Sequence, residues 1–105
     1  MDLNFHTSSE IIQILSSRLR TERLAQKLTQ SELAQRAGVG VNTVSNMEAG
    51  RNVSLDAVVR IAMVLGRDGE LKELFKPKLE TLHDLQRYED SVTRQRIRKG
   101  KNDVG

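Results

Sequence analysis

The chain of 105 residues contains no cysteine, one proline, three aromatic side chains and no long apolar run. The lack of cysteine excludes a disulfide framework and every thiolate metal site. The longest unbroken apolar run is residues 61–65, far short of the roughly 20 residues that a bilayer span needs, and the chain begins without a basic signal region. We therefore expect a soluble, cytoplasmic chain, not bound to a membrane, in which one domain and a short appendage are held by packing alone.

Aromatic and basic residues are both informative about partners. Phe5, Phe75 and Tyr88 are too few for the stacking platforms that hold single strands and RNA loops. The net charge is +3, and residues 1–75 are balanced, so the basic excess lies in residues 76–105. A mildly basic chain points only weakly to nucleic acid, and among nucleic acids these features favour duplex DNA.

Catalytic and metal-binding patterns are not found in the sequence. The two histidines, His6 and His83, are isolated, and we expect them at the surface rather than as metal ligands. Serine, aspartate and histidine residues are scattered without the spacing that would bring an acid, a base and a nucleophile into one cleft. We expect no enzyme activity, no metal and no cofactor.

Capping residues and glycines divide the first 75 residues into short helices. Thr29 and Glu32 form a capping box that starts a helix at Gln30, and Gly38 is expected to leave that helix with positive φ. Ser54 is expected to cap a later helix, and Pro77 to mark a boundary. The expected helices run from Ser8 or Ser9 to about Lys27, from Gln30 to Ala37, from Val41 to about Ala49, from Leu55 to Leu65, from Glu70 to Phe75, and from a Thr81 cap to about Thr93.

Apolar spacing predicts which side of each helix is buried. In the first helix, Ile11, Leu15 and Leu19 repeat every four residues. Beyond Thr93 the sequence is basic and apolar-poor, so we expect residues 94–105 to form a flexible tail. The other expected buried positions are Leu33, Ala34, Ala37, Leu55, Val58, Val59, Ala62, Leu65, Leu71, Leu74 and Phe75.

The two very short helices joined by residues 38–40 are typical of a helix-turn-helix, because they cannot lie side by side like long helices. A sharp crossing needs a small residue, a turn glycine and an apolar anchor, and Ala34, Gly38 and Val44 occupy these places. With these residues, the segment from Arg18 to Phe75 resembles the helix-turn-helix of the Cro/C1 (XRE) family, which includes the lambdoid phage repressors.

The resemblance implies an all-α, lambda-repressor-like domain of five helices over residues 1–75, with residues 1–8 as an arm. Residues 76–105 would form a short C-terminal extension, a helix followed by the basic tail. Two residues depart from the family pattern: Gly40 stands where a serine or threonine usually caps the recognition helix, and Val41 where a polar base reader is common.

One side of the helix from Val41 is expected to face DNA. On a helical wheel, small and polar residues gather on this side, whereas Glu48 points toward the core and so needs a partner. The resemblance supplies Arg23 as that partner, and it gives Gln30 a base contact or the role of bracing Asn42. The candidate base-contacting residues are Val41, Asn42, Ser45, Asn46 and Gln30, and the candidate phosphate-contacting residues are Thr29, Gln30, Thr43, Arg51 and Asn52.

These observations predict a sequence-specific, nucleoid-associated repressor of transcription, acting as a homodimer. Its two recognition helices would lie about 34–36 Å apart on a pseudo-palindromic operator of double-stranded DNA. The short domain followed by Leu74–Lys101 is also similar to HipB-type antitoxins, which repress their own operon and bind a HipA-type kinase toxin. Three alternatives stay open: a phage-type repressor or restriction-modification controller protein, a module that neutralises a partner with DNA binding secondary, and an ordinary helical bundle with a solvated polar face.

Overall fold

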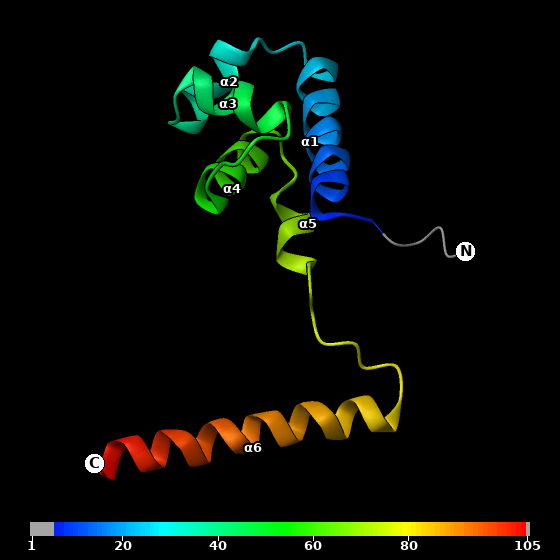
Figure 1. Cartoon of the computed structure of the whole chain (residues 1–105), viewed down its shortest axis with the longest axis vertical. Coiled ribbons are helices and arrows are strands. Elements are labelled where there is room, and N and C mark those ends of the chain that lie inside the picture. Colours follow the sequence, from blue (N-terminus) through cyan, green and yellow to red (C-terminus); the bar gives the residue numbers. More distant parts are fainter. Residues whose placement is uncertain (1–5, 105) are drawn as a thin grey trace. The chain divides into compact units, whose positions relative to one another are not determined.

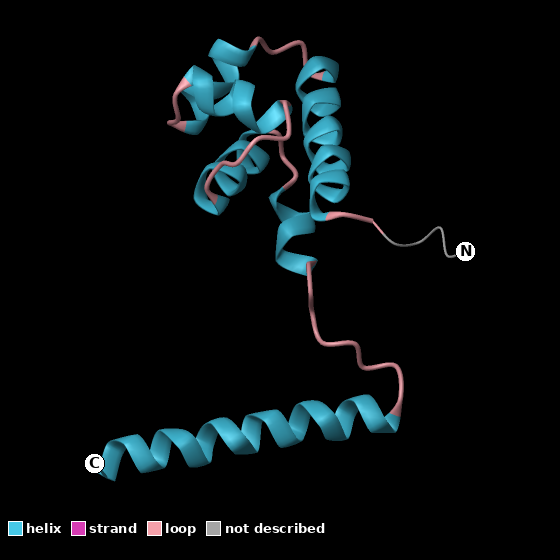
Figure 2. Cartoon of the chain, viewed as in Figure 1, coloured by secondary structure: helices cyan, strands magenta, loops and turns pink. Residues whose placement is uncertain are grey.

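The computed structural model describes the backbone of residues 6–104 and the side chains of residues 6–96. Over these residues the chain is helical and contains no strand, as predicted (Figure 2). It divides into two compact units, Met1–Glu73 and Leu74–Gly105. None of the helices in the described part is both long and apolar enough to cross a membrane. The helices are α1 (Ser8–Ala25), α2 (Gln30–Ala37), α3 (Val41–Glu48), α4 (Leu55–Val64), α5 (Asp68–Glu73) and α6 (Leu82–Val104).

The predicted caps start α2 and α4. The Thr29 hydroxyl accepts a hydrogen bond from the Glu32 amide at 3.0 Å, and the Glu32 carboxylate accepts one from the Thr29 amide at 2.9 Å. The Ser54 hydroxyl accepts from the amide of Ala57 at 3.1 Å. Gly38 has φ 70°, the left-handed conformation that ends α2. These boundaries confirm the predicted starts of α2 and α4 and the predicted end of α2. A capping residue acts on backbone groups only a few residues away, so its effect can be read from the sequence.

The two ends of α1 differ from the prediction. Thr7, not Ser8 or Ser9, is the N-cap, and it forms a capping box with Glu10. Ser8 therefore belongs to the helix rather than to the predicted arm, of which residues 1–5 lie outside the described part. At the other end, α1 stops at Ala25 because Lys27 adopts φ 59°, which ends the helix before the predicted residue.

The core of the first unit lies where α2 packs against α3 and α4, with α1 alongside (Figure 1). The predicted burial of α1 is wrong, because Ile11 and Leu15 are exposed and only Leu19 packs against the core. Leu55 is also exposed, since the buried stripe of α4 is centred on Ala57 and Ile61 instead. The core cluster consists of Leu28, Leu33, Ala34, Ala37, Val44, Met47, Ile61 and Leu65.

α5 lies two residues earlier than predicted. It ends at Glu73, and Leu74 and Phe75 are exposed rather than buried. Phe75 takes φ 58°, and Lys76 precedes Pro77, a position at which the helical conformation is disfavoured. The backbone therefore leaves the helix before the two apolar side chains can join the core.

α6 is longer than predicted. The Asp84 amide donates to the Thr81 hydroxyl at 3.1 Å, so Thr81 caps the helix as expected. The helix then continues past Thr93 to Val104, through the residues expected to form a flexible tail. Arginine, lysine and glutamine are good helix formers, and no proline interrupts this segment.

A buried ion pair fixes α3 against α1. The guanidinium of Arg23 donates to the Glu48 carboxylate through Nε at 2.6 Å and Nη2 at 2.9 Å, and the two side chains are 8% and 3% exposed. Arg23 Nη1 also donates to the carbonyl of Leu28 at 2.7 Å, and Gln30 Nε2 donates to Glu48 at 3.0 Å. This network joins α1, the turn after it, α2 and α3.

The network also makes the fold sensitive to acid. Burial of the Glu48 carboxylate acts to raise its pKa, but the hydrogen bonds from Arg23 and Gln30 and the charges of Arg23 and Arg20 outweigh burial and lower the pKa. Because the folded pKa lies below the unfolded one, the pair stabilises the fold above the unfolded pKa. That stabilisation disappears as the pH falls through the folded pKa.

We predict that Glu48→Gln lowers the free energy of unfolding by about 3 kcal/mol at pH 7, because Arg23 stays buried without its counter-charge. The difference from the wild type should shrink as the pH falls below about 4. Urea titrations at several pH values measure both effects. As a control, Asp56→Asn breaks the exposed Asp56–Arg60 pair and should cost less than about 1 kcal/mol. If Glu48→Gln lowered the free energy of unfolding equally at pH 3 and pH 7, the charge of Glu48 would not be what stabilises the fold.

Candidate nucleic-acid interface

α2 and α3 are joined by a tight turn. The Val39 amide donates to the carbonyl of Ala34 at 3.0 Å, and Gly40 precedes α3 without supplying a side-chain cap. Val44 and Met47 of α3 are buried at 0% and 2% exposure. Since these residues point into the core, the opposite side of α3 faces outward.

The predicted base-contacting residues of α3 lie on this outward side. Val41 is 44% exposed and Asn42 is exposed, while Ser45 and Asn46 are half-buried. The outward side therefore offers a methyl-bearing residue, a hydroxyl and two amides from a single short helix. This is the donor and acceptor chemistry that base edges in a major groove match.

Asn46 is linked to Arg51, one of the predicted phosphate contacts. Arg51 Nη1 donates to Asn46 Oδ1 at 3.2 Å, and the Arg51 amide donates to the carbonyl of Asn46 at 2.9 Å. A carbonyl oxygen has two lone pairs, so Asn46 Oδ1 keeps one for a second donor, and both amide hydrogens stay available. The guanidinium thus orients Asn46 without using up its capacity to bind a base.

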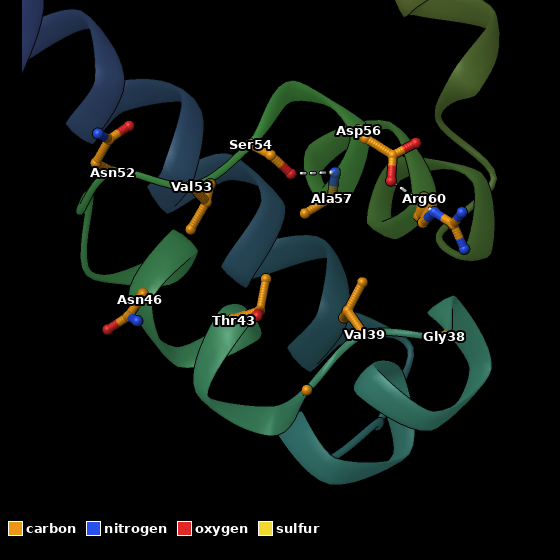
Figure 3. A pocket seen from close by; sticks show the side chains of 11 residues that line it. Gly38, Val39, Thr43, Asn46, Asn52, Val53, Ser54, Asp56, Ala57 and Arg60 are labelled. Carbon is orange, nitrogen blue, oxygen red and sulfur yellow. Dashed lines mark hydrogen bonds and ion pairs between the residues drawn. The ribbon is translucent and has the colours of Figure 1, made fainter.

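A polar hollow of about 490 Å³ lies beside α3 (Figure 3). Thr43 and Asn46 line it from α3, and Asn52 lines it from the segment that follows. Across the hollow, Arg60 donates to the Asp56 carboxylate at 2.8 Å, so their charges balance. The hollow thus places Thr43 and Asn52, two of the predicted phosphate contacts, on one surface.

The remaining predicted residues lie at the start of α2 and already have partners within the fold. In the capping box, the Thr29 hydroxyl accepts from the Glu32 amide and the Glu32 carboxylate accepts from the Thr29 amide. Gln30 is half-buried, and its side-chain amide donates to Glu48 rather than bracing Asn42. Gln30 keeps its side-chain oxygen as an acceptor, and its backbone amide stands at the positive end of the helix.

Two residues of α1 that the sequence did not single out hold the last turn of α3. Gln13 Nε2 donates to the carbonyl of Ala49 at 3.0 Å, and Arg20 lies 4.0 Å from the Glu48 carboxylate. Gly50 has φ 77°, and a Cβ atom there would collide with the Gln13 amide. Gln13 and Arg20 are seven residues apart and so share a face of α1, but nothing in the sequence shows that this face meets α3.

Across the described residues, no group of histidine, cysteine, aspartate and glutamate side chains is placed to hold a metal ion.

Comparison with known protein families agrees with the helix-turn-helix geometry of α2 and α3. The helix-turn-helix family matches residues 19–71, just over half of the chain, and this region includes all of α2, α3 and α4. The chain belongs to the Cro/C1 (XRE) helix-turn-helix family, a family of DNA-binding regulators of transcription.

Proposed function

We propose that this chain binds a specific sequence of double-stranded DNA through the outward side of α3 and represses transcription by occluding a promoter. The observation that carries the proposal is the division of α3 into two sides. Val44, Met47 and Glu48 fix the helix to the domain, which leaves Val41 and Asn42 free to meet a ligand. An eight-residue helix held in this way can enter the major groove without any rearrangement of the core.

The side chains of α3 suit direct readout of bases. Asn42 and Asn46 can each bond to adenine through both ends of the amide, and Val41 can contact a thymine methyl group. Ser45 can donate to or accept from a base. Each good pairing discriminates against the wrong base by about 1–3 kcal/mol.

Contacts to the DNA backbone would set the register of α3. Arg51 and Asn52 follow the helix and are exposed, and Thr43 lies on the same surface. The backbone amides at the start of α2, with Thr29 and Gln30, suit a second phosphate, because a helix N-terminus attracts anions. Such contacts position the protein but carry no sequence information.

A homodimer on a pseudo-palindromic operator is the simplest assembly for a reader this small. At about 1.5 Å per residue, α3 is about 12 Å long and reaches only a few base pairs. Two copies on half-sites one helical turn apart, about 34–36 Å, would double the length of sequence that is read.

We predict that Asn42→Ala weakens binding to the preferred duplex by about 5- to 100-fold and leaves binding to an unrelated duplex unchanged. The preferred duplex is first selected by the wild-type chain from a random-sequence library, and affinities follow from fluorescence anisotropy. Arg51→Ala should instead weaken both duplexes, the preferred one somewhat more because Arg51 also orients Asn46. It should reduce the slope of log affinity against log salt by about 0.9 for each phosphate that the variant no longer neutralises.

Arg18→Ala is the matched control for charge, because Arg18 is an exposed arginine of α1 that is not among the proposed DNA contacts. Arg18→Ala should change the specificity less than Asn42→Ala does and the salt slope less than Arg51→Ala does. The proposal that α3 reads the bases is wrong if the double variant Asn42→Ala and Asn46→Ala binds duplex DNA like the wild type while removal of residues 77–105 abolishes DNA binding.

A second role, as the autoregulating antitoxin of a HipA/HipB-like module, is favoured by three exposed apolar side chains near the start of the second unit. Leu74, Phe75 and Leu79 are 52%, 97% and 55% exposed. Large apolar side chains that stay in contact with water can be covered by a partner protein, and covering them would favour binding. The proposed partner is a HipA-type kinase toxin encoded beside this gene.

We predict that co-expression of this chain relieves growth arrest caused by such a kinase, and that Phe75→Ser abolishes the relief. Asn42→Ala should still protect, because kinase binding and base reading use different residues. Leu55→Ser is the control, since Leu55 is 76% exposed on α4. A gene with no kinase beside it, or a kinase that fails to co-purify with the wild-type chain, would favour a phage-type repressor or a restriction-modification controller protein instead.

A further inference from the structure

Arg60 is a charged residue of α4 that borders the hollow beside α3 (Figure 3). Its Nε donates to the Asp56 carboxylate at 2.8 Å, one helical turn earlier. Within residues 6–96, the terminal nitrogens Nη1 and Nη2 of Arg60 donate to no protein group. The ion pair therefore uses one nitrogen of the guanidinium and leaves the other two available to a ligand.

The guanidinium of Arg60 reaches the turn between α2 and α3. A Cβ atom at Gly38 would lie 3.5 Å from Nη1 of Arg60. Gly38 ends α2, and Gly40, two residues later, is the N-cap of α3. Thr43 and Asn46 line the same hollow from α3. Arg60 therefore brings a positive charge from α4 to the flank of α3 where two of the proposed DNA contacts lie.

A duplex that is read by α3 would bring its backbone to this flank. An α-helix with its side chains is about 10–12 Å across, and the major groove of B-DNA is about 12 Å wide. A recognition helix thus fills the groove, and the two sugar-phosphate strands run along its sides. Arg60 stands across the hollow from Thr43, on the side where one of these strands would pass.

The chemistry of Arg60 suits a phosphate, whereas that of Asp56 opposes one. A guanidinium presents its N–H groups in a planar fork that matches two phosphate oxygens, and such charge-assisted hydrogen bonds are stronger than neutral ones. The Asp56 side chain is 74% exposed, so water screens its attraction for Arg60. The carboxylate of Asp56 also repels an approaching phosphate. Asp56 therefore orients Arg60 through Nε and at the same time lowers the affinity for an anion.

We propose that Arg60 donates through its terminal nitrogens to a phosphate of the bound DNA, and that the charge of Asp56 limits the strength of this contact. The inference rests on the DNA binding of the proposed function and adds α4 to the surface that holds the duplex. A phosphate contact positions the duplex and reads no base. Arg60 thus contributes to the affinity for any duplex, and Asp56 reduces that contribution.

Two substitutions in the full chain should shift DNA binding in opposite directions. Arg60→Gln should weaken binding to the preferred duplex and to an unrelated duplex equally, by about tenfold, because the backbone is common to both. It should also reduce the slope of log affinity against log salt by about 0.9, the value for one phosphate. Asp56→Asn keeps an oxygen that accepts from Arg60 but loses the negative charge, so it should tighten binding to both duplexes about twofold to threefold. Fluorescence anisotropy measures these affinities.

Arg18→Gln and Asp90→Asn are the matched controls, because both residues are exposed and neither is among the proposed DNA contacts. Each control changes the net charge as its counterpart does, so it measures the long-range effect of one charge. That effect is screened by salt, and each control should change the affinity by less than about twofold. Circular dichroism checks that every variant keeps the helix content of the wild type.

Duplexes in which one phosphate at a time is replaced by an uncharged methylphosphonate locate the contact. One replacement should weaken binding by the wild type and leave binding by Arg60→Gln unchanged, because the variant has already lost that contact. A different replacement should do the same for Arg51→Gln. Arg51 is bonded to Asn46 within α3, whereas Arg60 reaches the turn that precedes this helix.

Three outcomes would overturn the assignment. One is an Arg60→Gln variant that binds both duplexes as Arg18→Gln does. Another is equal sensitivity of the wild type and of Arg60→Gln to every methylphosphonate. The third is an Asp56→Asn variant whose affinity is no higher than that of Asp90→Asn. A wild type that selects no duplex, or an Asn42→Ala variant that reads the preferred duplex unchanged, would instead refute the proposed function on which the contact rests.

Discussion

The contact between Arg23 and Glu48 is the constraint on which the DNA-binding unit depends. Glu48 belongs to the same eight-residue helix as the predicted base readers, so the atoms that fix this carboxylate also fix the orientation of Val41 and Asn42. A buried ion pair adds little net stability compared with apolar packing, but it tolerates only a narrow range of geometries. The pair therefore matters here chiefly for the position of α3, and Gln13 supports the same end of the helix.

The parts of the fold that were predicted from the sequence depend on short-range chemistry. Thr29 with Glu32, Ser54 and Gly38 act on neighbouring backbone groups, so their effect is visible in the sequence. The inward direction of Glu48 followed from the helical wheel, because Val44 and Met47 define the buried side. In each case the cause and its effect lie within one or two helical turns.

The errors concern contacts between distant segments. Leu15 and Leu55 fall at helical spacing, yet they are exposed because no other part of the described chain covers them. Phe75 fails to join the core because its own φ and Pro77 end the preceding helix. The link between Arg51 and Asn46 could not be predicted either, because it depends on how the chain turns after α3. Burial of an apolar residue thus requires a partner that periodicity alone does not reveal.

The two sides of α3 have opposite tolerance to mutation. The outward positions, Val41 and Asn42, can change without disturbing the packing, whereas Val44, Met47 and Glu48 cannot. A duplicated gene could therefore acquire a new operator through a few substitutions while keeping its stability. This separation gives the scaffold a short evolutionary route to regulators with many different targets.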